Sequence, residues 1–201
     1  MTTPAPRSKA RKKVFVDASS AILLYKAGLF SDLVNLFQVV MAPAVFREIT
    51  KKGYPGAAYF KSYFNSARIL LQEPIPFDHP LFALKNFISM DQGEKETIQI
   101  FCNLTRFGLP GKNFPDPKTK DFILVDDGEA ARFCQAQQIP FINSLLIPKI
   151  FWYSGVMDPN VYLEKTDRLC ELGRYSQKIM ERARQFSQAD LSYFLEKNLH
   201  G

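Results

Sequence analysis

Short, nearly continuous apolar runs alternate along this chain with longer segments in which apolar residues recur at helical spacing. Runs of that kind predict strands that are buried on both faces. The predicted strands are 14–17, 38–42, 122–127 and 140–143. Because such strands are joined by helical crossovers, the pattern predicts an α/β fold, with a parallel sheet and helices on both of its faces.

Helical spacing covers most of the sequence between these strands. A helix over 19–37 is expected to break around Gly28, and Pro43 stands where the first residue of the next helix belongs. The remaining predicted helices are 44–51, 56–64, 89–107, 129–137 and 144–153, with a further apolar stretch at 68–71. The segments 73–80 and 108–120 are predicted loops, the second because it is rich in Gly, Pro, Lys and Asp.

The sequence after residue 157 forms helices throughout, with expected breaks near Gly173 and Ser187. We therefore predict a flexible basic tail over 1–13, an α/β domain over 14–156 and a C-terminal helical extension over 157–201. The extension is expected to pack on the domain, although its amphipathic spacing would also suit a dimer or a bound partner.

Composition excludes several classes of protein. Of the 201 residues 46% are hydrophobic, which is enough for the core of one domain, and no apolar run reaches the roughly 18 residues of a membrane span. The N-terminus lacks the apolar stretch of a secretory signal. Three cysteines lie far apart in helical apolar patterns, which disfavours disulfides and a zinc site and favours a cytoplasmic protein; they are Cys102, Cys134 and Cys170.

Five acidic residues follow or lie near the ends of predicted strands, where parallel α/β sheets place their sites. They are Asp17, Glu48, Glu94, Asp126 and Asp127. Taken singly, each has a structural explanation, since Asp17 could cap a helix and both D-x-x-E segments have the form of a capping box. Glu94 fits that explanation least well, because at about 100° per residue it continues the core-facing stripe of its helix, whereas Glu96 points away and is expected to be solvated.

Converging carboxylates need a partner, and hard oxygen ligands without His or Cys suit Mg²⁺ or Mn²⁺. The sequence contains only two histidines, His79 and His200, so a zinc site built on imidazole is not expected. A cation held by carboxylates could activate water for attack on a phosphodiester, and no covalent nucleophile would be required.

Four segments, in order, resemble motifs of the PIN-domain family. VFVDASSAIL (14–23) is similar to the opening strand that ends in Asp, with Ser, Thr or Asn two residues on. APAVFREI (42–49) resembles the second motif with its Glu, and DQGEKETI (91–98) resembles the G-E-x-E segment of a bacterial and archaeal subgroup. ILVDDGEAAR (123–132) resembles the Asp pair at the end of a later strand.

The resemblance implies a three-layer α/β/α fold and metal-dependent hydrolysis of RNA, as in the toxin ribonucleases of toxin–antitoxin pairs. The implied metal site consists of Asp17, Glu48, Glu94 and one of Asp126 and Asp127, supported by Ser19, which would lie beside Mg²⁺ or Mn²⁺ through its hydroxyl or through a water. Many PIN domains have Thr or Ser two residues before the last Asp, and this chain has Val125 before Asp127. Burial at the strand end favours Asp126 as the ligand, whereas alignment on that pattern favours Asp127.

Lysines in predicted loops are candidates for contact with the RNA. Lys and Arg exceed Asp and Glu by 26 to 20, a weak sign of a polyanionic ligand. Those predicted to lie near the rim of the site are Lys51, Lys52, Lys112, Lys118 and Lys120. With single-stranded RNA as the expected substrate, an antitoxin-like inhibitor and a homodimer are possible partners. The rival hypothesis is a catalytically silent module of the same fold that binds nucleic acid or a protein.

Overall fold

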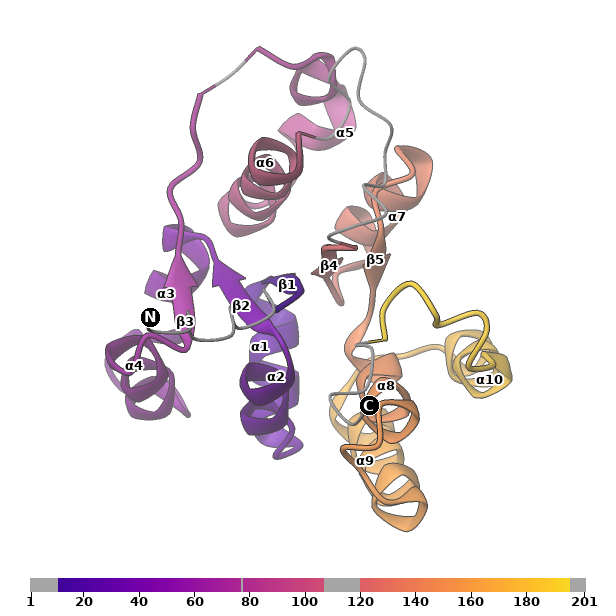
Figure 1. Cartoon of the computed structure of the whole chain (residues 1–201). Coiled ribbons are helices and arrows are strands. Elements are labelled where there is room, and N and C mark those ends of the chain that lie inside the picture. Colours follow the sequence, from indigo (N-terminus) through magenta and orange to yellow (C-terminus); the bar gives the residue numbers. More distant parts are fainter. Residues whose placement is uncertain (1–10, 77, 107–119, 196–201) are drawn as a thin grey trace, which may run out of the picture.

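The computed structural model describes residues 11–76, 78–106 and 120–195. Within them, five parallel strands form one sheet in the order β3-β2-β1-β4-β5. Figure 1 shows helices α6 and α7 on one side of this sheet and helices α1, α2, α8 and α9 on the other. The predicted three-layer α/β/α fold is therefore confirmed. The strands are β1 (Lys13–Val16), β2 (Gln38–Met41), β3 (Ile69–Leu71), β4 (Phe122–Leu124) and β5 (Phe141–Ile142).

The helices follow the predicted segments closely, with a turn at Gly28 (φ 70°) separating the first two. The apolar stretch at 68–71 contains the edge strand β3, and the helix expected from residue 89 begins at Gln92. The helices are α1 (Ala18–Lys26), α2 (Phe30–Leu36), α3 (Pro43–Ile49), α4 (Ala57–Asn65), α5 (Lys85–Ile88), α6 (Gln92–Thr105), α7 (Gly128–Ala136), α8 (Ile147–Tyr153), α9 (Pro159–Leu172) and α10 (Gln177–Gln185), with short 3₁₀ turns at Pro80–Ala83 and Ser144–Leu146. None of the helices in the described ranges is long and apolar enough to cross a bilayer.

The order of the strands determines where a site can form. The chain builds outward from β1 through β2 to β3 on one side, then returns to add β4 and β5 on the other. Phe15 of β1 is thus paired with Val40 of β2 and with Ile123 of β4. The point at which the order reverses lies between β1 and β4, and parallel α/β sheets bind ligands beyond the carboxyl ends of the strands at that point.

Aromatic rings fill the core beneath that point. Phe15 of β1 meets Phe101 of α6 edge-to-face, with ring centroids 5.2 Å apart. Phe122 of β4 lies between Phe37 and Phe194, at 5.4 Å and 5.2 Å. All three cysteines are free thiols; Cys102 and Cys134 are buried, and Cys170 is half-buried.

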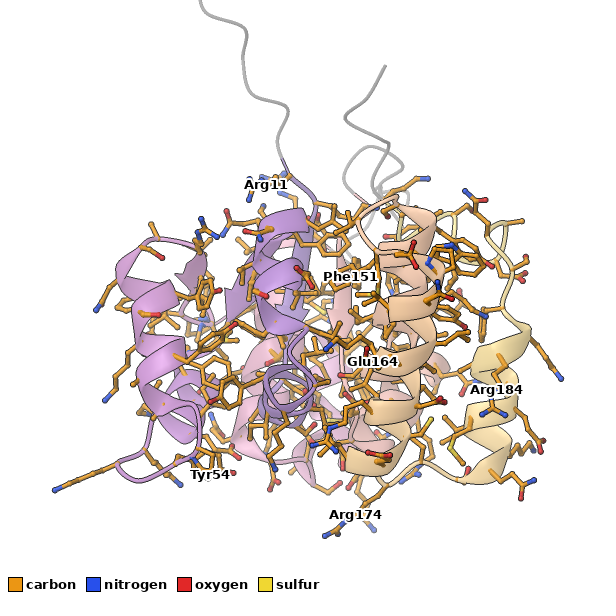
Figure 2. The ribbon with its side chains drawn as sticks, turned by 90° about the horizontal axis from the view of Figure 1, so that it is seen from below. Arg11, Tyr54, Phe151, Glu164, Arg174 and Arg184 are labelled. Atoms are coloured by element: carbon orange, nitrogen blue, oxygen red, sulfur yellow. The ribbon has the colours of Figure 1, made fainter. Side chains whose placement is uncertain are left out.

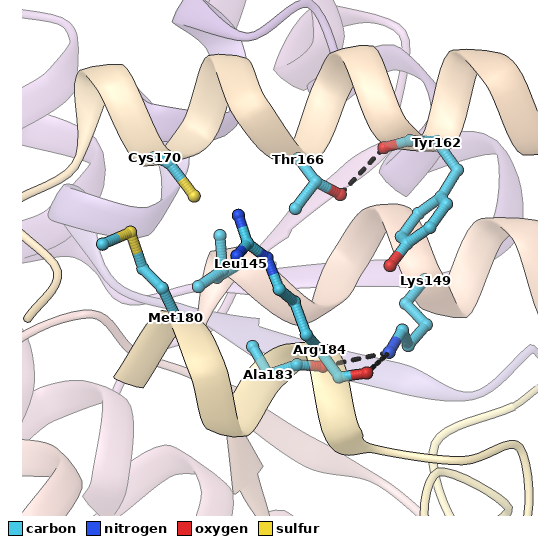
Figure 3. A pocket seen from close by; sticks show the side chains of 8 residues that line it. All are labelled: Leu145, Lys149, Tyr162, Thr166, Cys170, Met180, Ala183 and Arg184. Atoms are coloured by element: carbon cyan, nitrogen blue, oxygen red, sulfur yellow. Dashed lines mark hydrogen bonds between the residues drawn. The ribbon is translucent and has the colours of Figure 1, made fainter. Parts of the chain in front are cut away.

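The C-terminal segment packs against the α/β domain and is anchored to it by buried lysines. Lys149 of α8 donates to the carbonyl oxygens of Ala183, Arg184 and Phe186 (3.0, 2.8 and 3.0 Å), at the C-terminal end of α10. These carbonyls have no partner further along the helix, so the ammonium group satisfies them. The cavity beside this contact is about 10 Å³, room for about one water molecule (Figure 3).

A second lysine anchors the last described residues. Lys12 Nζ donates to the carbonyl oxygens of Tyr193 (3.0 Å) and Leu195 (2.6 Å), and Lys12 is 7% exposed. Lys13 is the first residue of β1. The end of the predicted flexible tail is thus part of the folded domain, while residues 1–10 lie outside the described ranges.

Candidate acidic site

The carboxyl edge of the sheet carries four of the five predicted acids around the point where the strand order reverses. Asp17 follows β1, and Asp126 and Asp127 lie just beyond β4. Glu94 lies in the first turn of α6, which packs against both of these strands. Strand topology therefore brings together acids that are more than 100 residues apart in the sequence.

Asp17 is the most enclosed of the four. Only 3% of its surface is exposed, and it caps α1 by accepting a hydrogen bond from the Ser20 amide at Oδ1 (2.7 Å). The Ser19 hydroxyl donates to Oδ2 (2.8 Å). This hydrogen bond orients the Asp17 carboxylate, while the predicted place of Ser19 beside a metal ion stays a prediction.

Asp126 is held by two residues that no motif indicated. Its Oδ1 accepts hydrogen bonds from the Ser144 amide (3.1 Å) and from the Tyr175 hydroxyl (2.5 Å). Its Oδ2 accepts from the hydroxyl and the amide of Ser144. Ser144 lies just beyond β5, and a polar residue after the last strand is the one feature of the sequence that could have identified it as part of the site. Tyr175 lies between α9 and α10, where no sequence pattern indicates a site.

Asp127 and Glu94 each have a structural role in addition to their place in the site. Asp127 caps α7, with its Oδ1 accepting from the amides of Glu129 (2.6 Å) and Ala130 (3.1 Å). Glu94 completes a capping box by accepting from the Asp91 amide (3.3 Å). The prediction that these acids cap helices is thus correct, because each bond satisfies an amide at the start of a helix.

The electrostatics of the four acids go beyond helix capping. Burial, followed by the charge of Asp126, raises the pKa of Asp17 to about 6. Burial and the charges of Asp127 and Asp17 raise the pKa of Glu94 to about 7, against the hydrogen bond from Asp91. Like charges near one another in a partly desolvated place resist ionisation together. The four carboxylates therefore form one electrostatic unit that a cation would stabilise.

The positions of two other acids, Glu48 and Glu96, differ from those predicted. Glu48 is exposed near the end of α3, and no hydrogen bond or ion pair of the described residues joins it to the four carboxylates. Glu96, predicted to be solvated, is 7% exposed and accepts a hydrogen bond from the Ala44 amide (2.9 Å). That prediction was wrong because both faces of α6 are covered, one by the sheet and the other by α3. Glu96 supplies the N-terminal cap that Ala42 cannot provide for α3.

Carboxylate and hydroxyl oxygens are the ligands that Mg²⁺ and Mn²⁺ prefer, so the donor chemistry of the four acids fits the implied ion. Two buried oxygens beside them, Ser20 Oγ and Asn143 Oδ1, have no hydrogen-bond partner in the structure. The spacing, however, is not that of a preformed site, because no three acidic, His or Cys side chains in the described ranges are gathered closely enough to hold a metal ion. The carboxylates would have to approach one another for a cation to bind.

The predicted lysines are divided between the two ends of the molecule. Lys51 and Lys52 precede Tyr54, and Figure 2 shows Tyr54 and Arg174 at the same end of the molecule, opposite Arg11. Because Arg174 is next to Tyr175, which bonds Asp126, this end carries the acids. Lys120 precedes β4 and so lies at the other edge of the sheet, with its Nζ 6.0 Å from the centre of the Tyr193 ring. Its predicted position near the site was wrong, and Lys112 and Lys118 lie outside the described residues.

Comparison with models of known protein families, with curated proteins and with solved structures finds no match for this chain.

Proposed function

We propose that this chain is a divalent-metal-dependent ribonuclease of the PIN type. Asp17, Glu94 and the pair Asp126–Asp127 would hold Mg²⁺ or Mn²⁺ at the carboxyl edge of the sheet. The observation that carries the proposal is the electrostatic linkage of these acids, since the pKa of Asp17 and that of Glu94 are raised by burial and by the other carboxylates. Perturbed acids gathered at the usual ligand-binding place of a fold are characteristic of functional sites.

The residues around the acids have distinct parts in this proposal. The Ser19 hydroxyl holds Asp17 in one orientation, and Ser144 does the same for Asp126. Asp17 and Asp127 cap the first turns of α1 and α7. Their carboxylates are thus held on rigid elements, which favours a constant geometry. A divalent ion held by these residues would lower the pKa of a bound water and neutralise charge on the phosphodiester.

Single-stranded RNA is the substrate we propose. Lys51, Lys52 and the exposed ring of Tyr54 lie on the loop after α3, and Arg174 shares their end of the molecule (Figure 2). Cationic and aromatic side chains at the end of the molecule that carries the acids suit a phosphate backbone with stackable bases. An antitoxin-like protein inhibitor and a homodimer belong to the same proposal through the resemblance to toxin ribonucleases.

Cleavage of a mixed single-stranded RNA by the pure full-length protein tests the proposal. We expect cleavage with Mn²⁺ or Mg²⁺, none with EDTA, and none by the double variant Asp17→Asn/Glu94→Gln. The matched control is Glu96→Gln, an acid of the same helix that binds the start of α3 instead of facing the site. Binding of RNA without cleavage, whichever metal is present, would favour the alternative of a silent nucleic-acid-binding module.

A further inference from the structure

The turn between α9 and α10 brings a tyrosine from the C-terminal segment into the acidic site. Tyr175 is half-buried, and its hydroxyl donates to Asp126 Oδ1 over 2.5 Å. That length is typical of a hydrogen bond from a hydroxyl to an ionised carboxylate, which is about twice as strong as one between neutral groups. A tyrosine hydroxyl carries its proton at neutral pH, so Tyr175 is the donor and Asp126 the acceptor of this bond.

Tyr175 and Ser144 together fix the Asp126 carboxylate. A carboxylate has about four lone-pair positions, and the three groups that donate to Asp126, the Ser144 amide, the Ser144 hydroxyl and the Tyr175 hydroxyl, leave one position for a cation. Oδ1 accepts from the Ser144 amide and from Tyr175, and Oδ2 accepts from the hydroxyl and the amide of Ser144. Tyr175 adds to the Ser144 contacts a donor from a different part of the chain, and each further donor restricts rotation of the carboxylate.

The restraint on Asp126 matters because the carboxylates of the site repel one another. Asp17 and Asp126 lie beyond the ends of the neighbouring parallel strands β1 and β4, so their carboxylates are at the same edge of the sheet, where like charges repel each other when no cation is present. An unrestrained Asp126 would relieve the repulsion by rotating toward solvent. Donors that hold Asp126 in place keep its carboxylate at the edge of the sheet that also carries Asp17, and outer hydrogen bonds of this kind commonly orient the carboxylates that bind metals.

The backbone at Gly173 makes room for the phenol ring. A Cβ atom at this position would overlap Cε2 of Tyr175 and lie 2.7 Å from its Cδ2, so the ring would have to move. The φ of Gly173 is −89°, so space, not backbone conformation, is what glycine provides here. Substitution of Gly173 is therefore a second and independent way to displace the hydroxyl from Asp126.

We propose that Tyr175 is a positioning residue of the acidic site, whose hydroxyl fixes the Asp126 carboxylate at the edge of the sheet that carries Asp17, so that the C-terminal segment completes the site. This inference rests on the proposed function, because it assigns Tyr175 a part in binding the same divalent ion. It also gives the C-terminal segment a role other than packing, since without residues 173–175 the site lacks one of the two residues that hold Asp126.

The test is titration of the metal-free full-length protein with Mn²⁺, with the free ion measured by its electron paramagnetic resonance signal. We expect Tyr175→Phe to weaken binding by about tenfold, the lower end of what loss of an outer-sphere partner costs. Gly173→Ala should weaken it in the same direction. The matched control is Tyr193→Phe, which removes a hydroxyl that donates to the Asp121 carbonyl (2.9 Å) at the far edge of the sheet and should leave Mn²⁺ affinity unchanged.

Thermal unfolding of each variant without metal shows whether it is folded before titration. If wild type binds Mn²⁺ and Tyr175→Phe binds it equally well or more tightly, the positioning role is overturned while the proposed nuclease stands. An equal loss in Tyr193→Phe would assign the effect to general loosening of the C-terminal segment and would also overturn the inference. Failure of wild type itself to bind Mn²⁺ would overturn the proposed function and this inference together.

Discussion

The two edges of the sheet treat buried charge in opposite ways. At the amino edge, the Lys12 ammonium meets two backbone carbonyls, and Asp121 accepts a hydrogen bond from the Lys13 amide (2.9 Å). At the carboxyl edge, Asp17 and Glu94 have acids as neighbours, and the pKa of each is raised. The C-terminal segment reaches both edges with a tyrosine, Tyr193 at one and Tyr175 at the other.

This difference separates charges that stabilise the fold from charges that weaken it. A buried charge that faces complementary donors or acceptors holds elements together, whereas acids grouped with acids cost stability unless a cation joins them. Proteins retain such unfavourable groups mainly at functional sites. The carboxyl edge is therefore where we expect activity, and the amino edge is where we expect only loss of stability when its charges are changed.

The largest expected effect is the loss of RNA cleavage when an aspartate at the carboxyl edge is replaced with asparagine. The same replacement at the amino edge is the comparison. Asp17→Asn should reduce RNA cleavage by about 100-fold or more, as expected for removal of a group essential to catalysis. It should not lower the melting temperature at pH 8, because asparagine caps helices well and removes a repelled charge. Asp121→Asn should leave cleavage intact and lower the free energy of unfolding by about 1 kcal/mol, because a charge-assisted bond becomes a neutral one. The reverse pattern would contradict the comparison.

The second prediction concerns the pH dependence of stability without metal. The pKa of Asp17 rises from 3.8 to about 6 on folding, and that of Glu94 rises from 4.5 to about 7. The folded state thus holds these protons more tightly than the unfolded state does. Their contribution to the free energy of unfolding is present below about pH 4 and is lost as pH rises toward 7.

The stability difference between wild type and Asp17→Asn/Glu94→Gln, measured by urea unfolding at a series of pH values, isolates this contribution from other titrating groups. We expect wild type to become less stable relative to the variant between about pH 4 and pH 7 and the difference to be constant above that range. Mn²⁺ should raise the melting temperature of wild type at pH 7 and not that of the variant. A difference that does not change with pH would show that folding does not raise the pKa of these acids.

The third prediction tests the amino edge alone. Lys12→Met preserves much of the side-chain volume but leaves the carbonyls of Tyr193 and Leu195 without the ammonium donor. Each buried group left unsatisfied costs about 1–3 kcal/mol, so we expect urea unfolding to show a decrease of about 2 kcal/mol in the free energy of unfolding. RNA cleavage at a temperature where the variant is folded should equal that of wild type. Loss of cleavage without loss of stability would contradict the division between the edges.

The smallest expected effect is on RNA affinity. Lys51→Ala/Lys52→Ala should weaken binding and reduce the slope of log affinity against log salt, by about 0.7 for each phosphate of a single strand that is no longer neutralised. Lys120→Ala, at the amino edge, is the matched control and should leave both quantities unchanged. Fluorescence anisotropy with a labelled RNA at several salt concentrations measures them. Equal decreases in the two variants would show that the RNA does not follow the carboxyl edge.

Local pattern was sufficient for much of this molecule. The apolar runs predicted the strands β1, β2, β4 and β5, because a strand buried on both faces of a parallel sheet needs apolar residues throughout. Acids immediately after β1 and β4 followed from the same pattern, and Asp17 and Asp126 proved to be electrostatic neighbours. The edge strand β3 was less clear, since Leu70 is 42% exposed and the run is short.

The sequence did not predict how elements that are distant along the chain pack against each other. Periodicity separates Glu94 from Glu96 on α6, but it does not reveal that α3 covers the second face and buries Glu96. Likewise, Lys51 and Lys120 look equivalent as loop lysines until the strand direction places them at different ends.

What the sequence by itself determined is the set of elements and the fact that acids follow two of the strands, because both depend on spacing along the chain. The tertiary structure alone decided which acids face one another, how far their pKa values rise, and that Tyr175, 49 residues from Asp126, bonds it. The physical reason is that burial, repulsion and hydrogen bonding depend on distances across packed elements, and packing angles are set by the whole core instead of any one segment.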